Sequence, residues 1–246
     1  MNAGEPLCAV LEWDSTFFGW TIARAMVPSL TPERGRAIEA WCAEHAVDCL
    51  YFLAAADDRA TGRVLEDLGF HLVDIRVTLE RTIGPELSDL AGLAEAAALV
   101  RPAAPADIAA LKAIAGVSHR NTRFHADVRF DREQCDELYR VWIEKSCLGD
   151  AERVFVIDQD GSPAGYMTVH LEGSAGRLGL LGVDPARRRG GLARRLVLGA
   201  LAWLRDQKAG RAYLLTQGVN VDSQRLFQGL GFRTSAVALW YHRWFA

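Results

Sequence analysis

The sequence of 246 residues has few cysteines, no marked excess of either charge and no long hydrophobic run. Its five cysteines are odd in number and form no C-x-x-C pair, so free thiols in a reducing cytoplasm are predicted instead of a disulfide framework. No run of about 18 apolar residues occurs, so neither a transmembrane helix nor a membrane partner is expected. The stretch Met1–Val10 lacks a cationic region leading into an apolar one, which predicts no signal peptide.

Charge and histidine content narrow the function further. The formal net charge of −3 argues against nucleic acid as a partner, because a polyanion needs at least a local basic face. The six histidines are scattered without ligand-like spacing, so no metal site is predicted. Half of the residues are hydrophobic and 24% are charged, the balance of a globular protein with one large or two small domains.

Hydrophobic periodicity divides the chain into a small α/β N-terminal domain over 1–81, a connector over 82–99 and a larger domain over 100–246. In the first domain the pattern predicts helices over 31–46 and 58–68 and strands over 48–54 and 70–79. In the larger domain it predicts helices over 105–118, 131–147, 192–204 and 221–230, and strands over 153–158, 163–171, 177–183, 211–216 and 232–244. The fold class is therefore α/β (α+β), a mixed central sheet with flanking helices.

The most informative segment is Val183–Ala193, which reads VDPARRRGGLA between a predicted strand and a predicted helix. Glycines let backbone N–H groups approach an anion closely, and a helix start adds unpaired N–H donors and the positive end of its dipole. Gly190, Gly191, Leu192 and Ala193 would supply these amides. The segment therefore predicts a cradle for pyrophosphate built mainly from main chain.

A second motif, Asn220–Phe227 (NVDSQRLF), is followed by the helix stop Gly231-Phe232. An Asn side chain at this point has two uses, because it holds both a donor and an acceptor: capping the helix or bonding to amides of a ligand.

The order R-x-x-G-x-A at Arg188–Ala193, the Asn220 motif and the order of elements together resemble the GNAT superfamily of N-acetyltransferases. The resemblance implies acetyl-CoA as co-substrate, with its pyrophosphate in the cradle and added charge from Arg188 and Arg189. It implies that Leu181 and Val183, at a splayed strand end, offer backbone groups to the pantetheine arm and thioester. It also places Asn220 and Phe227 at the thioester end.

The catalytic acid and base are not apparent. The superfamily often has Tyr where this chain has Phe227, and Phe cannot donate a proton to the leaving thiolate. Tyr241, Tyr213 and Ser223 are alternative acids. The strand before the cradle contains no carboxylate, so the candidate bases are His170, Glu172, His125 and Asp127. A Lys amine of pKa ~10.4 is neutral only about once in 2,500 molecules at pH 7, whereas an amine on a sugar ring needs less help from a base.

Further segments concern the acceptor. Leu11–Gly19 (LEWDSTFFG), and Arg123-Phe124 with Tyr139 and Trp142-Ile143, resemble the bacterial TDP-fucosamine acetyltransferase family (dTDP-4-amino-4,6-dideoxygalactose N-acetyltransferases), two-part enzymes with a small domain ahead of a GNAT domain. The resemblance implies transfer of acetyl to the primary amine of a nucleotide-linked amino-deoxysugar bound between the halves. Arg123, Asp127 and Trp142 are its candidate binding residues, with Arg123 facing the diphosphate.

Alternatives stay open at this point. A peptide, protein or small-amine N-acetyltransferase and a non-catalytic acyl-CoA-binding module both fit the same cradle, and a homodimer is one possible assembly. Leu65–Phe70 also echoes Phe227–Phe232. Either both share one helix-stop device, with glycine in the left-handed region, or the first domain is a degenerate GNAT-like half.

Overall fold

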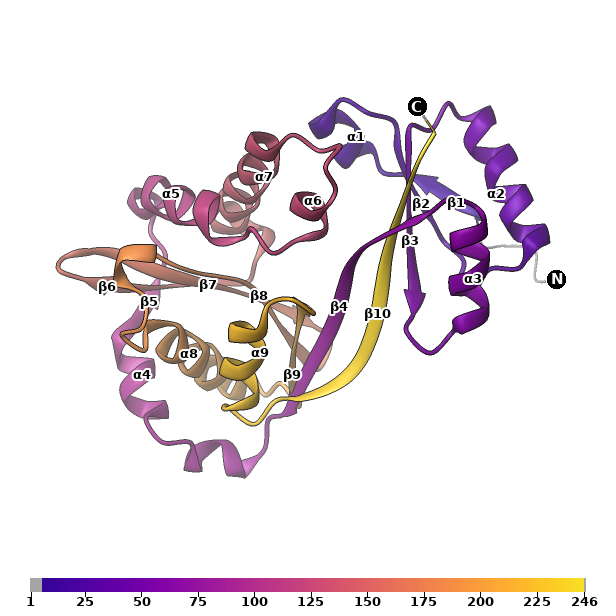
Figure 1. Cartoon of the computed structure of the whole chain (residues 1–246). Helices are drawn as coiled ribbons and strands as arrows, with labels where there is room; N and C mark the ends of the chain where they lie inside the picture. The colour runs from indigo at the N-terminus through magenta and orange to yellow at the C-terminus, as the bar shows by residue number, and fades with distance from the viewer. Residues whose placement is uncertain (1–5, 246) are drawn as a thin grey trace. The chain divides into compact units, whose positions relative to one another are not determined.

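The computed structural model describes residues 6–245, which form two compact units (Figure 1). Among the described residues, unit 1 comprises 6–76, 122–130 and 237–245, and unit 2 comprises 77–121 and 131–236. These units differ from the predicted division at 81 and 100, because two later segments group with the N-terminal one. The expected absence of a leader at Met1–Val10 falls partly on residues outside the described ones.

The sheet of unit 1 joins segments from both ends of the chain. Its strands are β1 (Cys8–Val10), β2 (Ile22–Ala25), β3 (Cys49–Ala55) and the second half of β10 (Arg233–Trp244). Strand β2 pairs parallel with β3, and β10 pairs antiparallel with β3, so that Arg24 lies beside Tyr51 and Tyr51 beside His242. The helices of this unit are α1 (Glu12–Phe18), α2 (Pro32–Glu44), α3 (Arg59–Asp67) and α6 (Arg123–Ala126).

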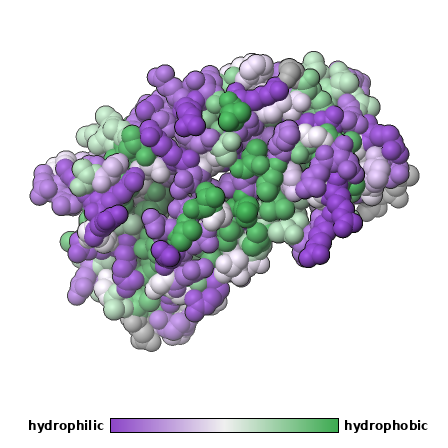
Figure 2. Space-filling model, viewed as in Figure 1, coloured by the Kyte–Doolittle hydropathy of each residue, from purple (hydrophilic) through white to green (hydrophobic). Residues whose placement is uncertain are grey.

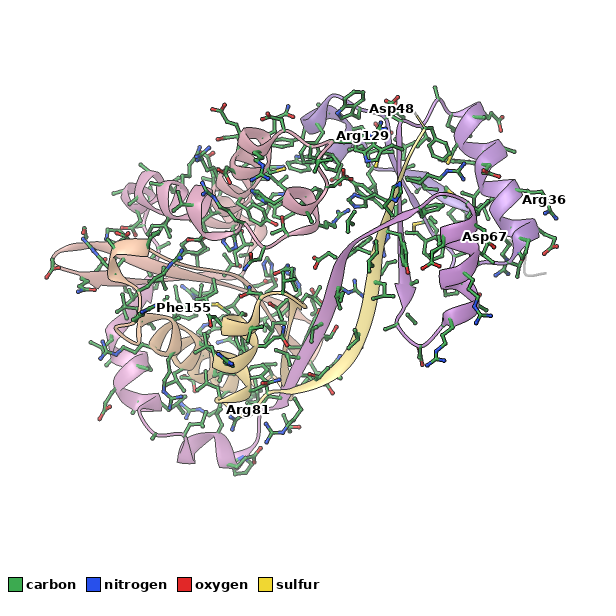
Figure 3. All side chains as sticks on the ribbon, viewed as in Figure 1. Arg36, Asp48, Asp67, Arg81, Arg129 and Phe155 are labelled. Atoms are coloured by element: carbon green, nitrogen blue, oxygen red, sulfur yellow. The ribbon has the colours of Figure 1, made fainter. Side chains whose placement is uncertain are left out.

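The two faces of this sheet differ in character because side chains alternate along each strand. One face, with Leu50, Phe52 and Tyr241, packs against Ile38 of α2 and Leu65 of α3 as a hydrophobic core. The outer surface over α3 is mostly hydrophilic (Figure 2), and Arg36 of α2 points away from the sheet (Figure 3). The opposite face is polar and aromatic, and Phe18 of α1 stacks there on Phe124.

Unit 2 is built around its own run of neighbouring strands and the long helix α8 (Leu192–Asp206). Its strands lie in the order β9 (Arg211–Gln217), β8 (Ala175–Val183), β7 (Ser162–Glu172), β6 (Arg153–Gln159) and β5 (Val100–Pro102). Strands β8 and β9 are parallel, and the other neighbouring pairs are antiparallel. Strand β4 (His71–Thr82) passes from unit 1 into unit 2, where it neighbours β9.

The remaining helices of unit 2 are α4 (Leu93–Leu99), α5 (Ile108–Ser118), α7 (Arg132–Lys145) and α9 (Val221–Gln228). Short helical turns lie at Pro85–Asp89, Pro105–Asp107, Ser146–Asp150 and Pro185–Arg187. The predicted connector is therefore part of the fold, because α4 contributes Leu93 and Ala96 to the core around α8. Within residues 6–245 no helix is long and apolar enough to cross a membrane.

The echoed segments end their helices in the same way. Gly69 and Gly231 have φ angles of +76° and +84°, in the left-handed region that favours glycine. Phe70 N–H donates to the Leu65 carbonyl at 2.9 Å, and Phe232 N–H donates to the Phe227 carbonyl at 3.1 Å. The shared helix-stop device is confirmed, whereas the degenerate GNAT-like half stays a prediction.

Candidate functional site

The predicted cradle lies between β8 and α8 in unit 2. Gly191 is the residue before α8, with a φ of +78°, and no side chain caps the helix there. By contrast, side chains cap α2, α3, α7 and α9, from Thr31, Asp58, Asp131 and Asn220. The first amides of α8 are therefore open donors at the positive end of a 15-residue helix. This is the geometry that an anion needs.

The arginines before the cradle have separate roles. Arg187 fixes the loop, since its guanidinium donates to the carbonyls of Gln159 and Ser162 at 2.9 and 3.2 Å. Arg188 Nε donates to the Val183 carbonyl at 3.2 Å. Arg188, Arg189, Gly190 and Gly191 are exposed. The exposed arginines add positive charge beside the open amides.

Strands β8 and β9 separate where the cradle begins. Their pairing ends at Leu178 opposite Leu214, and Leu181 and Val183 lie beyond this point, as predicted for a splayed strand end. On its other side β8 has a bulge, because two of its residues lie opposite Thr168 alone. Leu180 N–H donates to Thr168 Oγ1 at 2.8 Å. The bulge thus begins where the pairing of β8 with β9 ends, directly after Leu178.

His170 lies next to this bulge on β7. A Cβ placed on Gly179 would lie 3.2 Å from His170 Nε2, so the imidazole faces the first residue of the splayed segment. Burial lowers the pKa of His170, and the Arg177 cation lowers it further. At neutral pH the ring is therefore uncharged and able to accept a proton. Within unit 2, His170 therefore lies at the start of the splayed segment, and its role as a base stays a prediction.

Two other residues considered for proton transfer are committed to each other. Tyr213 donates its hydroxyl proton to Glu172, which also accepts from Arg177 Nε at 2.6 Å. These two bonds lower the pKa of Glu172, and burial together with the nearby carboxylate raises the pKa of Tyr213. Both shifts weaken their predicted catalytic roles, because Glu172 becomes a poorer base and Tyr213 a poorer acid.

Asn220 and Phe227 occupy the helix that follows β9. Asn220 Oδ1 accepts from Ser223 N–H at 3.3 Å, so of its two predicted uses the structure displays the helix cap. Phe227 is 2% exposed and meets Phe232 edge to face, with ring centroids 5.3 Å apart. Its ring is part of the hydrophobic core around α8.

Phe227→Tyr is expected to keep or raise turnover while lowering the free energy of unfolding by about 1–3 kcal/mol, because a buried hydroxyl without a partner is costly. Turnover is measured as CoA release and stability by urea unfolding. Phe232→Tyr is the matched control, since Phe232 is also fully buried and the two rings pack together. A loss of acetyl-CoA affinity in Phe227→Tyr alone would contradict the alignment of residue 227 with the Tyr position of the superfamily.

The structure corrects the prediction for Tyr241. Its side chain is 4% exposed and lies in the hydrophobic core of unit 1. A Cβ added to Gly62 of α3 would lie 3.8 Å from its hydroxyl oxygen. Burial raises its pKa, and Glu66 raises it further. Tyr241 is a core residue of unit 1, because the alternation along β10 turns it toward α2 and α3.

The three predicted acceptor residues are divided between the units. Arg123 and Asp127 belong to unit 1, and Trp142 of α7 belongs to unit 2. Asp127 Oδ2 accepts from His242 Nδ1 at 2.7 Å and from Trp244 Nε1 at 2.9 Å, and Oδ1 accepts from Arg129 N–H at 3.1 Å. Asp127 is thus corrected to a buried structural carboxylate, both of whose oxygens already accept hydrogen bonds within unit 1.

One polar pair near the cradle has no counterpart in the sequence predictions. Tyr166 and His119 meet at 2.8 Å between Oη and Nε2, and the ring of Tyr166 covers Gly182 of the splayed segment. The period of two along β7 places Tyr166 on the face that carries Thr168 and His170. No local pattern links His119 to this face, because 47 residues separate it from Tyr166.

Comparisons with known proteins agree with this geometry. Residues 119–232 match the model of the acetyltransferase (GNAT) family. Mycothiol acetyltransferase of Kineococcus radiotolerans is 36% identical over 169 residues, 66% of this chain and 52% of that protein. The spore coat polysaccharide biosynthesis protein SpsD of Bacillus subtilis is 25% identical over 143 residues, 58% of this chain and 50% of SpsD. The chain thus spans about half the length of both relatives.

A solved structure extends the likeness to most of the fold. The GNAT-family N-acetyltransferase of Sphaerobacter thermophilus superimposes with a TM-score of 0.60 at 14% identity, covering 91% of this chain and 72% of that one. The predicted fold class, a mixed sheet with flanking helices of the GNAT type, is confirmed.

Proposed function

From the match of residues 119–232 to the model of the acetyltransferase (GNAT) family, we propose that the chain transfers acetyl from acetyl-CoA to the primary amine of a nucleotide-linked amino-deoxysugar. The observation that carries the acetyl-CoA part is the uncapped start of α8, where Gly191 has left-handed backbone and the first helical amides are open. A pyrophosphate held there accepts from main chain and is flanked by Arg188 and Arg189.

The splayed end of β8 supports the rest of the co-substrate assignment. Backbone groups of Leu181 and Val183, beyond the last pair with β9, would bond to the pantetheine arm and stabilise the oxyanion that forms on the thioester carbonyl. The amine nitrogen attacks this carbonyl, the C–N bond forms and the C–S bond breaks. His170 or water takes the proton from nitrogen, and the CoA thiolate leaves and takes a proton from solvent.

The acceptor is supported by two lines. The first is the resemblance of Leu11–Gly19 and Arg123–Ile143 to TDP-fucosamine acetyltransferases. The second is the similarity to SpsD, whose name connects that relative with polysaccharide biosynthesis. Relatives named mycothiol acetyltransferase make a mycothiol-type amine the second candidate.

A panel assay of CoA release tests this proposal. We expect release with dTDP- or UDP-linked amino sugars to exceed that with peptides, simple amines and a mycothiol-type amine by about tenfold or more, a difference of ~1.4 kcal/mol in transition-state binding. Faster CoA release with peptides than with amino sugars would show that the acceptor is a peptide amine. Binding of acetyl-CoA without release from any amine would point to an acyl-CoA-binding module.

A further inference from the structure

Three arginines of unit 1 gather around one indole ring on the polar face of its sheet. The guanidinium carbons of Arg123, Arg24 and Arg76 lie 4.5, 5.3 and 5.9 Å from the centroid of Trp240. Arg123 also lies 4.1 Å from the ring centroid of Tyr51. An aromatic face stabilises a cation, but three cations around one ring repel each other.

Among residues 6–245, only one of these three cations has a hydrogen-bond or ion-pair partner for its side chain. Arg123 Nη2 lies 4.0 Å from Asp14 Oδ2, and Arg123 Nη1 donates to His242 Nε2 at 3.2 Å. The side chains of Arg24 and Arg76 have no hydrogen bond or ion pair with any described residue, and both residues are half-buried. Burial is the main cause that lowers the pKa of both arginines. The Arg123 cation lowers the pKa of Arg24 further, and the Arg24 cation lowers that of Arg76 further.

Unpartnered polar atoms concentrate at the same place. Among the described residues, five buried side-chain polar atoms lack a hydrogen-bond partner, and three of them are Arg24 Nε, Arg76 Nε and Tyr51 Oη. Arg24 and Tyr51 are direct neighbours across β2 and β3. The Tyr51 side chain is fully buried. Buried donors that are left unpaired are rare, so a cluster of three needs an acceptor.

We propose that Arg24 and Arg76 form an anion-binding site that takes a phosphoryl or diphosphate group, with Tyr51 Oη as a further donor. Two planar guanidinium groups present paired N–H donors that match the oxygens of phosphate. Two uncompensated positive charges fit a multiply charged phosphate better than a single carboxylate. The identity of its biological ligand, the diphosphate of the nucleotide-linked acceptor, rests on the proposed function.

The test is calorimetry of the full chain with inorganic pyrophosphate and with dTDP, at saturating acetyl-CoA so that the α8 cradle is filled. We expect both probes to bind, and Arg24→Gln and Arg76→Gln each to weaken binding by about tenfold or more. Arg63→Gln is the matched control, because this substitution removes the same charge from an exposed residue on α3 of the same unit. Its affinity for pyrophosphate should equal that of the wild type.

Tyr51→Phe supplies a second variant that avoids a folding defect, because it removes a buried hydroxyl without a partner and should leave the melting temperature unchanged or raise it. We expect it to weaken pyrophosphate binding by about threefold or more. Pyrophosphate binding that disappears at saturating acetyl-CoA, or that Arg24→Gln and Arg76→Gln leave unchanged, would overturn the site. If the panel assay finds no sugar-nucleotide acceptor while arginine-dependent binding persists, the proposed acceptor fails and the anion site stands.

Discussion

Gly191→Glu is expected to abolish acetyl-CoA binding in calorimetry, a loss of at least about a hundredfold in affinity. The new carboxylate would sit at the uncapped start of α8, where it accepts from the same amides and repels the pyrophosphate. Charge-assisted hydrogen bonds contribute roughly 1.5–3 kcal/mol each, so losing two of them exceeds the ~2.7 kcal/mol of a hundredfold change.

The backbone of Gly191 adds a second cost that must be separated from the first. Its φ of +78° is unfavourable for any other residue, so part of the effect is on folding. Gly173→Glu is the matched control, since Gly173 has a φ of +62°, no neighbour within 4 Å of an added Cβ, and lies in the β7–β8 turn. We expect equal strain but unchanged acetyl-CoA affinity. If Gly191→Glu bound acetyl-CoA as tightly as the wild type, the cradle would not be the pyrophosphate site.

The cradle could be predicted because its chemistry is local. A strand, a glycine-containing turn and a helix start follow each other within Leu178–Ala193, so their arrangement depends little on the rest of the chain. The same holds for α2, whose predicted cap at Thr31 accepts from Arg34 N–H at 3.3 Å. Sequence periodicity fixes such elements because their hydrogen bonds lie within the segment.

The organisation of the units depends on contacts that no local pattern contains. Strand β10 pairs with β3, which is far from it in the sequence, and Trp244 lies opposite Cys49. This pairing draws the C-terminus into unit 1 and decides which face of β10 is buried, so Tyr241 enters the core while His242 joins the polar face. Short elements such as α1 were missed for the same reason, because Phe18 is held by tertiary stacking on Phe124 and Phe130.

The polar clusters also depend on contacts between segments that are distant in the sequence. The arginine cluster combines β2, β4, α6 and β10, and the Tyr166–His119 contact joins β7 to the residue that follows α5. Each side chain taken alone looks like an ordinary surface residue of its own element. Side-chain chemistry assembled from several segments becomes visible only when register and pairing are known, whereas backbone chemistry within one segment is visible earlier.

Asp127→Ala is expected to lower the free energy of unfolding by about 3–5 kcal/mol in urea titrations, because it leaves the buried donors of His242 and Trp244 without an acceptor. Asp127→Asn should cost less, since its amide oxygen still accepts one of these bonds. Asp131→Asn, at the exposed N-cap of α7, is the control and should cost little. A loss below about 1 kcal/mol in Asp127→Ala would show that the carboxylate does not hold the segment to β10.

The same contact makes stability depend on pH through His242. Burial is the main cause that lowers its pKa to about 4; the Asp127 hydrogen bond opposes this shift and the Arg123 cation adds to it. The neutral ring donates from Nδ1 to Asp127 and accepts at Nε2 from Arg123, so a second proton would break the contact with Arg123.

In the unfolded chain the pKa of histidine is ~6.5, so between pH 6.5 and 4 the unfolded state binds the proton and the folded state does not. Stability from His242 is therefore complete above pH 6.5 and falls as the pH drops. Between pH 7 and pH 4.5 we expect the wild type to lose about 2–3 kcal/mol more than His242→Gln, whose side chain keeps one donor and one acceptor. Burial raises the pKa of Asp74 to about 6, which acts in the opposite direction over this range. Asp74 is present in both proteins, so its contribution cancels in the difference, and parallel pH profiles of the two would contradict the assignment.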